Sequence, residues 1–296
     1  MRFVKFACLW ATVLVLCAPL SESLRKPLPE YRVEVPESGR ELWPYLYWYD
    51  HKATPRFYLP PHRLVMHGAY PYAGGWNPLV AACGGGPQPL AWFYGCHQPA
   101  NLAEMYRLPL RGEPGEALPP WELPWLAGAR RRCPSGEAGL GIEHGVSYYG
   151  PATPEKIALE CRRLREITGG ICAEGFRPDR YGDIEGYFMR SGDDDFRFFV
   201  RGGKHRAAAL VALSGDAPVP VTFKTGWPRV INRADVAEWP LIHTGQVSVA
   251  LALAVFDRYF EGNPVMAEAP APEAQSVIST SRPLSAASAT ASTTRM

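Results

Sequence analysis

The chain has 296 residues with nearly balanced charge: 31 Lys and Arg against 29 Asp and Glu, a formal net charge of +2. This balance excludes the strongly basic composition of a nucleic-acid coat protein and the acidity of a disordered, solvating chain. Hydrophobic residues make up 47% and charged residues 20%, an ordinary mixture for a folded core. The 30 prolines and 28 glycines follow no collagen-like period, so we expect one or two domains rich in turns.

Residues 1–24 have the pattern of a signal peptide or signal anchor. Arg2 and Lys5 precede an uncharged run over 6–21, which is shorter than the roughly 20 residues that span a bilayer comfortably. The pattern predicts a membrane-associated protein, with a periplasmic or secreted protein as the alternative. If these residues do not direct the protein to a membrane, we expect them to form a buried N-terminal helix. Basic residues flank the run on both sides, so charge does not decide the side of the membrane.

The segment over 27–135 is rich in aromatic residues and proline. Short apolar bursts between Pro and Gly predict small strands, turns and one helical patch near 101–106. Exposed aromatic rings could form a carbohydrate surface, but we favour the interpretation that they anchor a small core with little regular structure. Residues 128–136 read as a charged linker, and the arginines over 130–132 would also suit anionic lipid or phosphate.

A helix is predicted over 154–168, because Thr153 can cap it, Pro154 suits its first position and Glu155 suits the helix dipole. Apolar residues recur along this segment at helical spacing, and Gly169-Gly170 is expected to end the helix. The apolar side consists of Ile157, Leu159, Cys161, Leu164 and Ile167.

The chain after this helix is expected to alternate between strands and one further helix. A short helix, a turn near 175–178 and a strand over 184–189 come first, followed by a strand over 196–200. A helix over 205–213 and a strand over 218–223 complete the series.

The turn between strand and helix has the chemistry of an anion site. Gly202 and Gly203 let the backbone approach a ligand closely, and the free amides at a helix start favour an anion. Lys204, His205 and Arg206 add cationic side chains, and an arginine can grip a phosphate with two donors.

The stretch from about 143 to 225 resembles the ParB/sulfiredoxin superfamily. The segments that carry the likeness are GPATPEKIALECRRLREI, GGICAEGFRP, DIEGYFM, FRFFVRGGKHRAAALVAL and APVPVTF. The turn is similar in sequence to the G-G-x-H-R-x-x-A motif of sulfiredoxins. The matching residues are Gly202, Gly203, His205, Arg206 and Ala209. The resemblance implies that this turn binds nucleotide phosphates.

Two differences from the family pattern limit which of the family's functions this chain could have. Sulfiredoxins carry their reactive cysteine where this chain has Lys204, so sulfinic-acid reduction has no nucleophile here. ParB proteins continue into a helix-turn-helix, and no such glycine-linked helix pair follows Phe223. Together with the near-neutral charge, this argues against nucleic acid as a partner, although a ParB-like DNA-associated protein stays as a third alternative.

A third branch resembles free amino-acid kinases, which use the same scaffold to hold a nucleotide and phosphorylate a small hydroxyl. Phosphoryl transfer needs positioning, cationic charge and an orienting carboxylate. Glu185 and Asp183 are the candidates for that carboxylate, and Lys204 for neutralising developing charge. The implied cofactor is a nucleoside triphosphate or diphosphate with Mg²⁺. Glu143 and His144, at the start of the module, are further candidates for the border of the pocket.

Two main hypotheses therefore remain open. One is a nucleotide-dependent phosphotransferase that acts on a small hydroxyl or on a glycan or lipid-linked precursor, a context that the overall layout resembles in bacterial surface-polysaccharide proteins. The other is a non-catalytic module that binds a nucleotide or phosphosugar. Export would separate the protein from cytoplasmic nucleotides, so an outside location would favour a phosphorylated or sulfated glycan instead.

The predicted fold class is α+β: a small mixed sheet with helices over 141–225, preceded by the loop-rich aromatic region. A helical extension over 226–263 is expected to pack back on the module, and an Ala-, Pro-, Ser- and Thr-rich tail over 264–296 to be disordered. Neither the seven cysteines nor the seven histidines show metal-ligand spacing, so no metal site is predicted. The packing residues expected in the extension are Trp239, Leu251, Val255 and Phe256.

Overall fold

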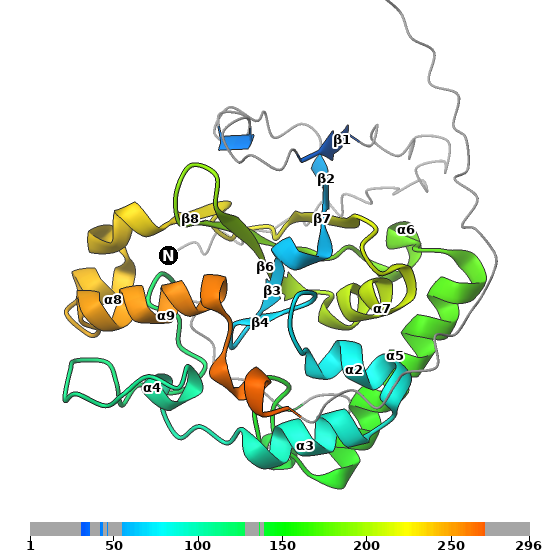
Figure 1. Ribbon diagram of the computed structural model, residues 1–296, viewed down its shortest axis with the longest axis horizontal. Helices are drawn as coiled ribbons and strands as arrows, with labels where there is room; N and C mark the ends of the chain where they lie inside the picture. Colours follow the sequence, from blue (N-terminus) through cyan, green and yellow to red (C-terminus); the bar gives the residue numbers. More distant parts are fainter. Residues whose placement is uncertain are drawn as a thin grey trace, which may run out of the picture.

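The computed structural model describes residues 31–35, 42–43, 46, 55–127, 136 and 139–269. Over these residues the chain forms a mixed β-sheet with helices on both faces (Figure 1). The predicted leader over 1–24 lies outside the described residues, and so does the predicted tail from 270 onward. In the described part of the chain, no helix is both long and apolar enough to cross a membrane.

The described strands form one eight-stranded sheet in the order β1-β2-β7-β5-β6-β3-β4, with β8 also paired to β5. Pairs β2–β7, β5–β6 and β3–β4 are antiparallel, whereas β1–β2, β3–β6, β5–β7 and β5–β8 are parallel. The strands are β1 (Tyr31–Glu34), β2 (Pro55–Leu59), β3 (Leu64–Met66), β4 (Tyr70–Pro71), β5 (Glu185–Arg190), β6 (Phe196–Gly202), β7 (Val219–Phe223) and β8 (Val230–Asn232).

Helices connect and cover these strands. The α-helices are α2 (Pro78–Gly85), α3 (Gln88–Cys96), α4 (Leu102–Met105), α5 (Pro154–Glu174), α6 (Pro178–Tyr181), α7 (Lys204–Ser214), α8 (Pro240–His243) and α9 (Val249–Glu261). Short 3₁₀ turns are η3 (Pro61–Arg63), η5 (Ile142–His144), η6 (Arg233–Glu238) and η7 (Pro264–Glu268). The predictions for β5, β6, α7, β7 and α4 are confirmed to within two residues at each end.

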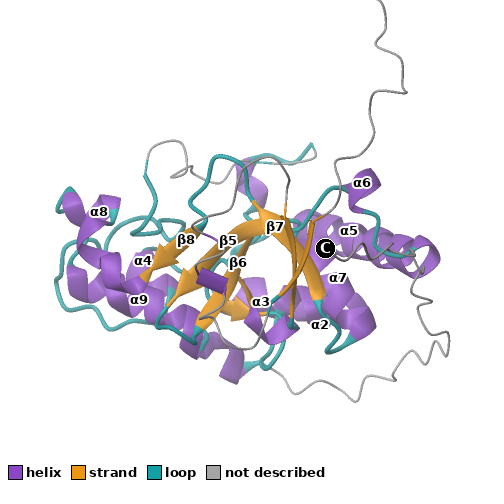
Figure 2. Cartoon of the chain, turned by 90° about the horizontal axis from the view of Figure 1, so that it is seen from above, coloured by secondary structure: helices purple, strands orange, loops and turns teal. Residues whose placement is uncertain are grey.

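Both faces of the sheet are buried, which explains why the middle residues of its central strands β5 and β6 are mostly apolar. Side chains alternate along β6, so Phe198 and Phe199 enter different hydrophobic clusters. The Phe198 cluster lies under α2, α3, α5 and α7, and the Phe199 cluster under α4, α8 and α9. Figure 2 shows the strands between these two groups of helices. The result is a three-layer mixed α/β arrangement.

Helix α5 runs past the point where it was predicted to stop. It continues through Gly169 and Gly170 to Glu174 and ends at Gly175, whose φ of 77° is the left-handed conformation that glycine favours. The prediction of an end at 168, with a separate short helix after it, is therefore wrong. A glycine pair weakens a helix by about 1 kcal/mol per residue but breaks none of its hydrogen bonds.

The aromatic region over 55–127 has more regular structure than predicted. Strands β2 and β3 pair with β7 and β6, so this region completes the main sheet, which is larger than the small sheet expected. Helices α2 and α3 replace the turns that the sequence predicts, because proline is common both in turns and in the first turn of a helix. Pro78 and Pro89 lie in the first turn of each helix, where a proline lacks no needed hydrogen bond.

The C-terminal extension packs on the sheet as predicted. Trp239, Leu251, Val255 and Phe256 are all buried in the cluster that contains Phe199. The ordered chain also continues beyond residue 263, where the tail was predicted to begin. Val265 is buried there, because Asn263 donates hydrogen bonds to the carbonyls of Gly68 and Met105 and holds this turn against the core.

Candidate functional site

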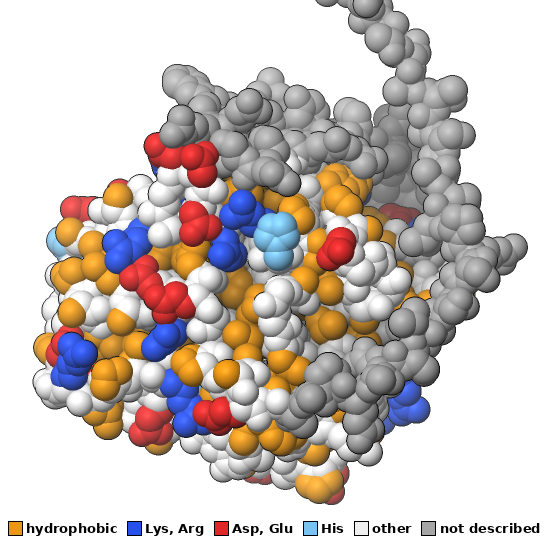
Figure 3. All heavy atoms as spheres, viewed as in Figure 1, with side chains coloured by type: hydrophobic (Ala, Val, Ile, Leu, Met, Phe, Trp, Pro, Cys, Tyr) orange, Lys and Arg blue, Asp and Glu red, His pale blue; other side chains and the backbone are white. Residues whose placement is uncertain are grey.

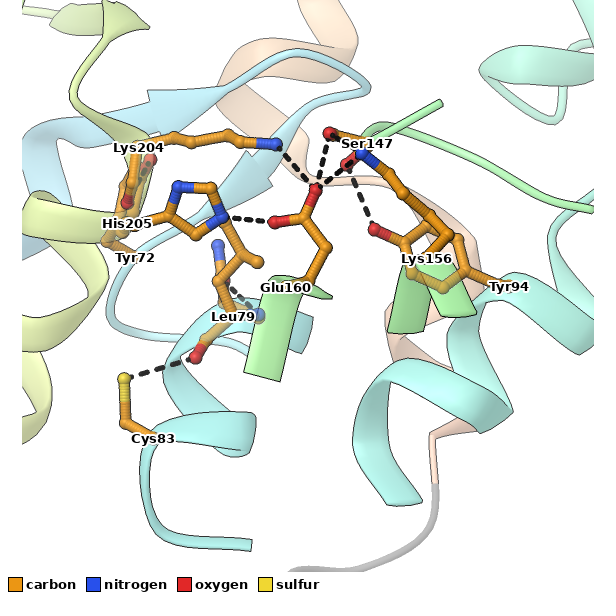
Figure 4. Close-up of polar contacts among 10 residues, drawn as sticks. Tyr72, Leu79, Cys83, Tyr94, Ser147, Lys156, Glu160, Lys204 and His205 are labelled. Carbon is orange, nitrogen blue, oxygen red and sulfur yellow. Dashed lines mark hydrogen bonds and ion pairs between the residues drawn. The ribbon is translucent and has the colours of Figure 1, made fainter. Parts of the chain in front are cut away.

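A fully buried carboxylate, Glu160 on α5, lies at the centre of the described polar contacts (Figure 4). Acidic side chains are rarely fully buried unless they are paired. Helix α5 places Glu160 because Thr153 caps the first turn, accepting a hydrogen bond from the amide of Lys156, and Pro154 begins it. Leu159, Cys161 and Leu164 are buried as predicted, and Glu160 shares their side of the helix.

Four side chains converge on this carboxylate from three segments. Lys156, one helical turn earlier, places its Nζ 3.0 Å from Oε1, and Lys204 at the start of α7 places its Nζ 3.6 Å from the same oxygen. The hydroxyl of Ser147 donates to Oε1 at 2.6 Å. His205 bonds through Nε2 to Oε2, and since a carboxylate only accepts, that nitrogen carries the proton.

The Glu160 cluster carries more positive than negative charge. Burial alone would raise the pKa of Glu160, but Lys204, His205 and Lys156 outweigh it and hold the pKa well below its usual range. Burial and the neighbouring Lys204 cation lower the pKa of His205 despite the carboxylate, so the imidazole is neutral near pH 7. Two ammonium groups then face one carboxylate, which leaves an excess of one positive charge.

Tyr148 and Arg201 extend this cluster towards the sheet. The Nζ of Lys204 lies 5.1 Å from the centroid of the Tyr148 ring, and Nη1 of Arg201 donates to the Tyr148 hydroxyl at 3.1 Å. The Arg201 guanidinium also lies 5.2 Å from the ring centroid of Trp227. Among the described residues no carboxylate is paired with Arg201. A second positive charge therefore lies beside the first.

His67 follows β3 at the same edge of the sheet, because β3 and β6 are parallel and their carboxyl ends meet there. Its ring is buried and lies 5.0 Å from the ring of Tyr148. Burial, and next the Arg201 cation, lower the pKa of His67 to about 3. Its Nε2 has no hydrogen-bond partner among the described residues. Ligands of open α/β sheets bind at the carboxyl ends of strands, which is where these groups gather.

The start of α7 has no side-chain cap. Side chains cap α2, α5 and α9 through Asn77, Thr153 and Ser248, whereas no described side chain caps α3, which begins after Pro87, or α7, which begins after Gly203. The uncapped N–H groups at a helix start carry partial positive charge and can donate hydrogen bonds to an anion. The excess charge of the Glu160 cluster and this helix start therefore reinforce each other.

The predicted glycine turn is explained by packing within the chain. Gly203 has a φ of 78°, and a Cβ there would lie 2.9 Å from the carbonyl oxygen of Asp183 and 3.1 Å from the Cα of Ile184. A Cβ on Gly202 would lie 3.1 Å from Oε2 of Glu185. The close approach that these glycines permit is thus to the start of β5.

The other predicted site residues divide into two groups. Lys204 and His205 face Glu160, whereas Arg206 turns the opposite way and donates to the carbonyls of Tyr181 and Asp183, both at 2.7 Å. Its two Nη atoms therefore fix the loop before β5, so the predicted two-donor grip on a phosphate is already occupied. This guanidinium acts first as a structural tie.

The predicted carboxylates are already paired. Asp183 bonds Arg56 at 2.8 Å, and Glu185 bonds the Nζ of Lys224 at 3.0 Å. Both lie beside Arg206, on the β5 side of the turn, and among the described residues neither contacts the Glu160 cluster.

Glu143 and His144 belong to the turn η5, and the His144 side chain reaches the start of α5. The Nδ1 of His144 is 3.0 Å from the Thr153 hydroxyl and 3.9 Å from a carboxylate oxygen of Glu155. His144 thereby supports the helix cap, and Glu143 is exposed to solvent. Over the described residues, no group of three or more His, Cys, Asp or Glu side chains is arranged to hold a metal ion.

Sequence reasoning missed Glu160, Lys156, Ser147, Tyr148, Arg201 and His67. A signal existed for the first two: Lys156 and Glu160 are spaced i,i+4, and residue 160 falls on the apolar stripe defined by Ile157 and Leu164. A charged residue at such a position must be buried with a partner. Nothing local marks Ser147, Tyr148 or His67.

Comparisons with known proteins add no information about this site. A scan of family models, a search of curated proteins and a search of solved structures each found no match to the chain.

Proposed function

We propose that this protein binds the phosphate groups of a nucleotide at the start of α7. The observation that carries the proposal is the excess of positive charge beside an uncapped helix start, with Lys156 and Lys204 sharing one buried carboxylate. Arg201 adds a further cation without a described acidic partner. Ordered cations together with free helix amides are a favourable setting for phosphate oxygens.

The order of elements supports a ParB/sulfiredoxin-like assignment for this part of the chain. Helix α5, strands β5 and β6, the glycine turn, α7 and β7 follow one another in the order that the resemblance implies. Lys204 replaces the sulfiredoxin cysteine and points at Glu160. The change exchanges a nucleophile for a fixed positive charge, which favours phosphate binding over sulfur chemistry.

Phosphoryl transfer to a hydroxyl is the activity that we infer as the second step of this proposal. Mg²⁺ would come with the nucleotide, because Mg²⁺ is usually held by phosphates and one or two carboxylates. Asp183 and Glu185 are the carboxylates nearest to the turn, and each would have to leave its partner, Arg56 or Lys224, to orient an acceptor. Their pairing favours the non-catalytic binding module as the alternative.

A membrane location and a glycan or lipid-linked acceptor remain part of the proposal through residues 1–24, outside the described part of the chain. The DNA-associated alternative calls for an extended basic surface. On the face seen in Figure 3, basic and acidic side chains are interspersed. That face therefore offers no support for the DNA alternative.

Calorimetry on the full chain with Mg²⁺ and either ATP or inorganic tripolyphosphate tests the binding site. Lys204→Met should weaken both ligands by roughly tenfold or more, since it removes a charge-assisted contact. Lys224→Met is the matched control, because Lys224 pairs with Glu185 on the β5 side of the turn. Equal loss in both variants, or no binding by the wild type, would overturn the proposed phosphate site.

Glu185→Gln separates binding from catalysis. Loss of product formation with unchanged nucleotide affinity would support phosphotransfer through this carboxylate. If both are unaffected, Glu185 has no catalytic part, and the binding module becomes the better description.

A further inference from the structure

A hollow lies beside the second half of α5, between this helix, α6 and the first turn of α7. Its volume is about 260 Å³, and apolar side chains contribute most of its walls. Figures 1 and 2 show the three helices on the same side of the sheet. The lining residues are Glu166, Ile167, Gly170, Ile171, Phe176, Tyr181 and Arg206.

Gly170 helps to create this space. It lies inside a 21-residue helix, where glycine costs about 1 kcal/mol relative to alanine, and it was expected to end the helix. A Cβ added at Gly170 would meet nothing within 4 Å, so packing does not require glycine there. A larger side chain at this position would instead project into the hollow.

The lining combines flat aromatic surfaces with a polar edge. The rings of Phe176 and Tyr181 and the guanidinium plane of Arg206 are the groups on which planar heterocycles stack. The Nε–H of Arg206 is buried and has no partner among the described residues, although both Nη atoms are engaged. Glu166 supplies an acceptor. A planar ring with both donors and acceptors on its edge fits this set better than an alkyl chain.

The hollow is close to the proposed phosphate site. Ile167 follows Glu160 by seven residues, which places it on the same side of α5 about 10 Å further along the axis. Arg206 belongs to the same first turn of α7 as Lys204, although its guanidinium faces away from Glu160. A ligand with a planar ring and a phosphate chain would have to pass the start of α7 to reach both.

We propose that this hollow binds the base of the nucleotide whose phosphates lie at the start of α7. The inference rests on the proposed function and adds the recognition of the base to it. Stacking on aromatic side chains would strengthen nucleotide binding relative to phosphates alone by roughly tenfold or more.

The test compares ATP, CTP and GTP with inorganic tripolyphosphate by calorimetry, on the full chain with Mg²⁺. At least one nucleotide should bind roughly tenfold or more tightly than tripolyphosphate. Gly170→Leu should reduce that nucleotide to the affinity of tripolyphosphate while leaving tripolyphosphate itself unchanged. Gly169→Leu is the matched control, because Gly169 is exposed and does not line the hollow.

Tyr181→Ala gives a second test that does not depend on filling the hollow. Tyr181 is 43% exposed, so removal of its ring should leave folding intact and weaken nucleotide binding alone. Equal affinity of nucleotides and tripolyphosphate for the wild type would overturn this inference and leave the phosphate site standing. Absence of binding by either ligand would overturn both.

Discussion

Glu160 shows how one residue can organise a site while remaining inaccessible to solvent. Its ionised form is maintained by two lysines and a neutral histidine, with the Ser147 hydroxyl as a further donor. Breaking a buried ion pair leaves an uncompensated charge, which costs far more than losing a surface pair. The same arrangement that stabilises the fold thus places the cations that we assign to phosphate.

Glu160→Gln should destabilise the protein by roughly 3 kcal/mol or more, because Lys156 and Lys204 would lose their carboxylate while still largely buried. Urea unfolding of the full chain measures the effect. Glu166→Gln, an exposed position on the same helix, is the control and should change stability by less than about 0.5 kcal/mol. Similar losses in the two variants would contradict a charge cluster centred on Glu160.

Because His67 is buried, we expect the free energy of unfolding to fall in mild acid. Its pKa in the folded state is lowered to about 3, so below its ordinary value of 6.5 the unfolded chain takes up a proton that the folded chain refuses. Its contribution to stability is complete above pH 6.5 and declines as the pH falls towards 3. The slope from this one group is about 1.4 kcal/mol per pH unit.

His67→Gln removes this titration, so its stability between pH 6 and pH 4 should fall less steeply than that of the wild type by about that slope. Urea unfolding at several pH values provides the comparison. Glu160, whose pKa is lowered in the folded state, is present in both proteins, so its own titration cancels in the comparison. Parallel pH profiles for the two proteins would show that His67 is protonated in the folded state.

At the scale of elements, α5 has the largest share in the proposed site. Its first half holds Lys156 and Glu160, and its second half forms a wall of the hollow beside Arg206. The helix can serve both regions only because it continues through the glycine pair. Its continuity is therefore a testable feature of the fold.

Gly169→Ala should stabilise the protein by roughly 0.5–1 kcal/mol, because alanine favours a helix and a Cβ there meets nothing within 4 Å. Thermal unfolding should show a higher Tm. Gly175→Ala should have the opposite effect, since residue 175 ends the helix with a φ of 77°. A loss of stability in Gly169→Ala as large as that in Gly175→Ala would mean that α5 ends before residue 169.

At the scale of the whole molecule, the segment over 141–225 shares its sheet and core with the aromatic region. Strand β2 pairs with β7, and β3 pairs with β6. The buried ring of Phe57 contacts Phe188 and Phe223 edge-on, at centroid distances of 5.3 and 5.2 Å. Removal of the first region would expose both the edges and an apolar face of the remaining strands.

A fragment of residues 141–225 should therefore show no cooperative unfolding transition, while the full chain does. Near-UV circular dichroism and urea titration of both would reveal the difference. The open strand edges of such a fragment would also favour aggregation. A fragment with a sharp, reversible transition would establish this segment as an independent domain and would contradict the shared core.

Local signals in the sequence were sufficient for much of the second half of the chain. The cap at Thr153, the apolar runs of β5 and β6 and the glycine before α7 each act over a few residues, so their elements could be predicted. The prediction is wrong at the glycine pair in α5 and at the prolines that begin α2 and α3. Glycine occurs inside helices as well as at their ends, and proline occurs at helix starts as well as in turns. Packing decides between these roles.

Most elements of the second half of the chain, their apolar faces and the group of cations at 204–206 can be predicted from local sequence. Which of these residues meet depends on the packing of the whole chain. Ser147, Glu160 and His205 are brought together although 45 residues separate the last two. Burial in one cluster then fixes charge: a carboxylate stays ionised, an imidazole stays neutral and two lysines lose their solvent. Such coupling depends on distances through space, which no local pattern encodes.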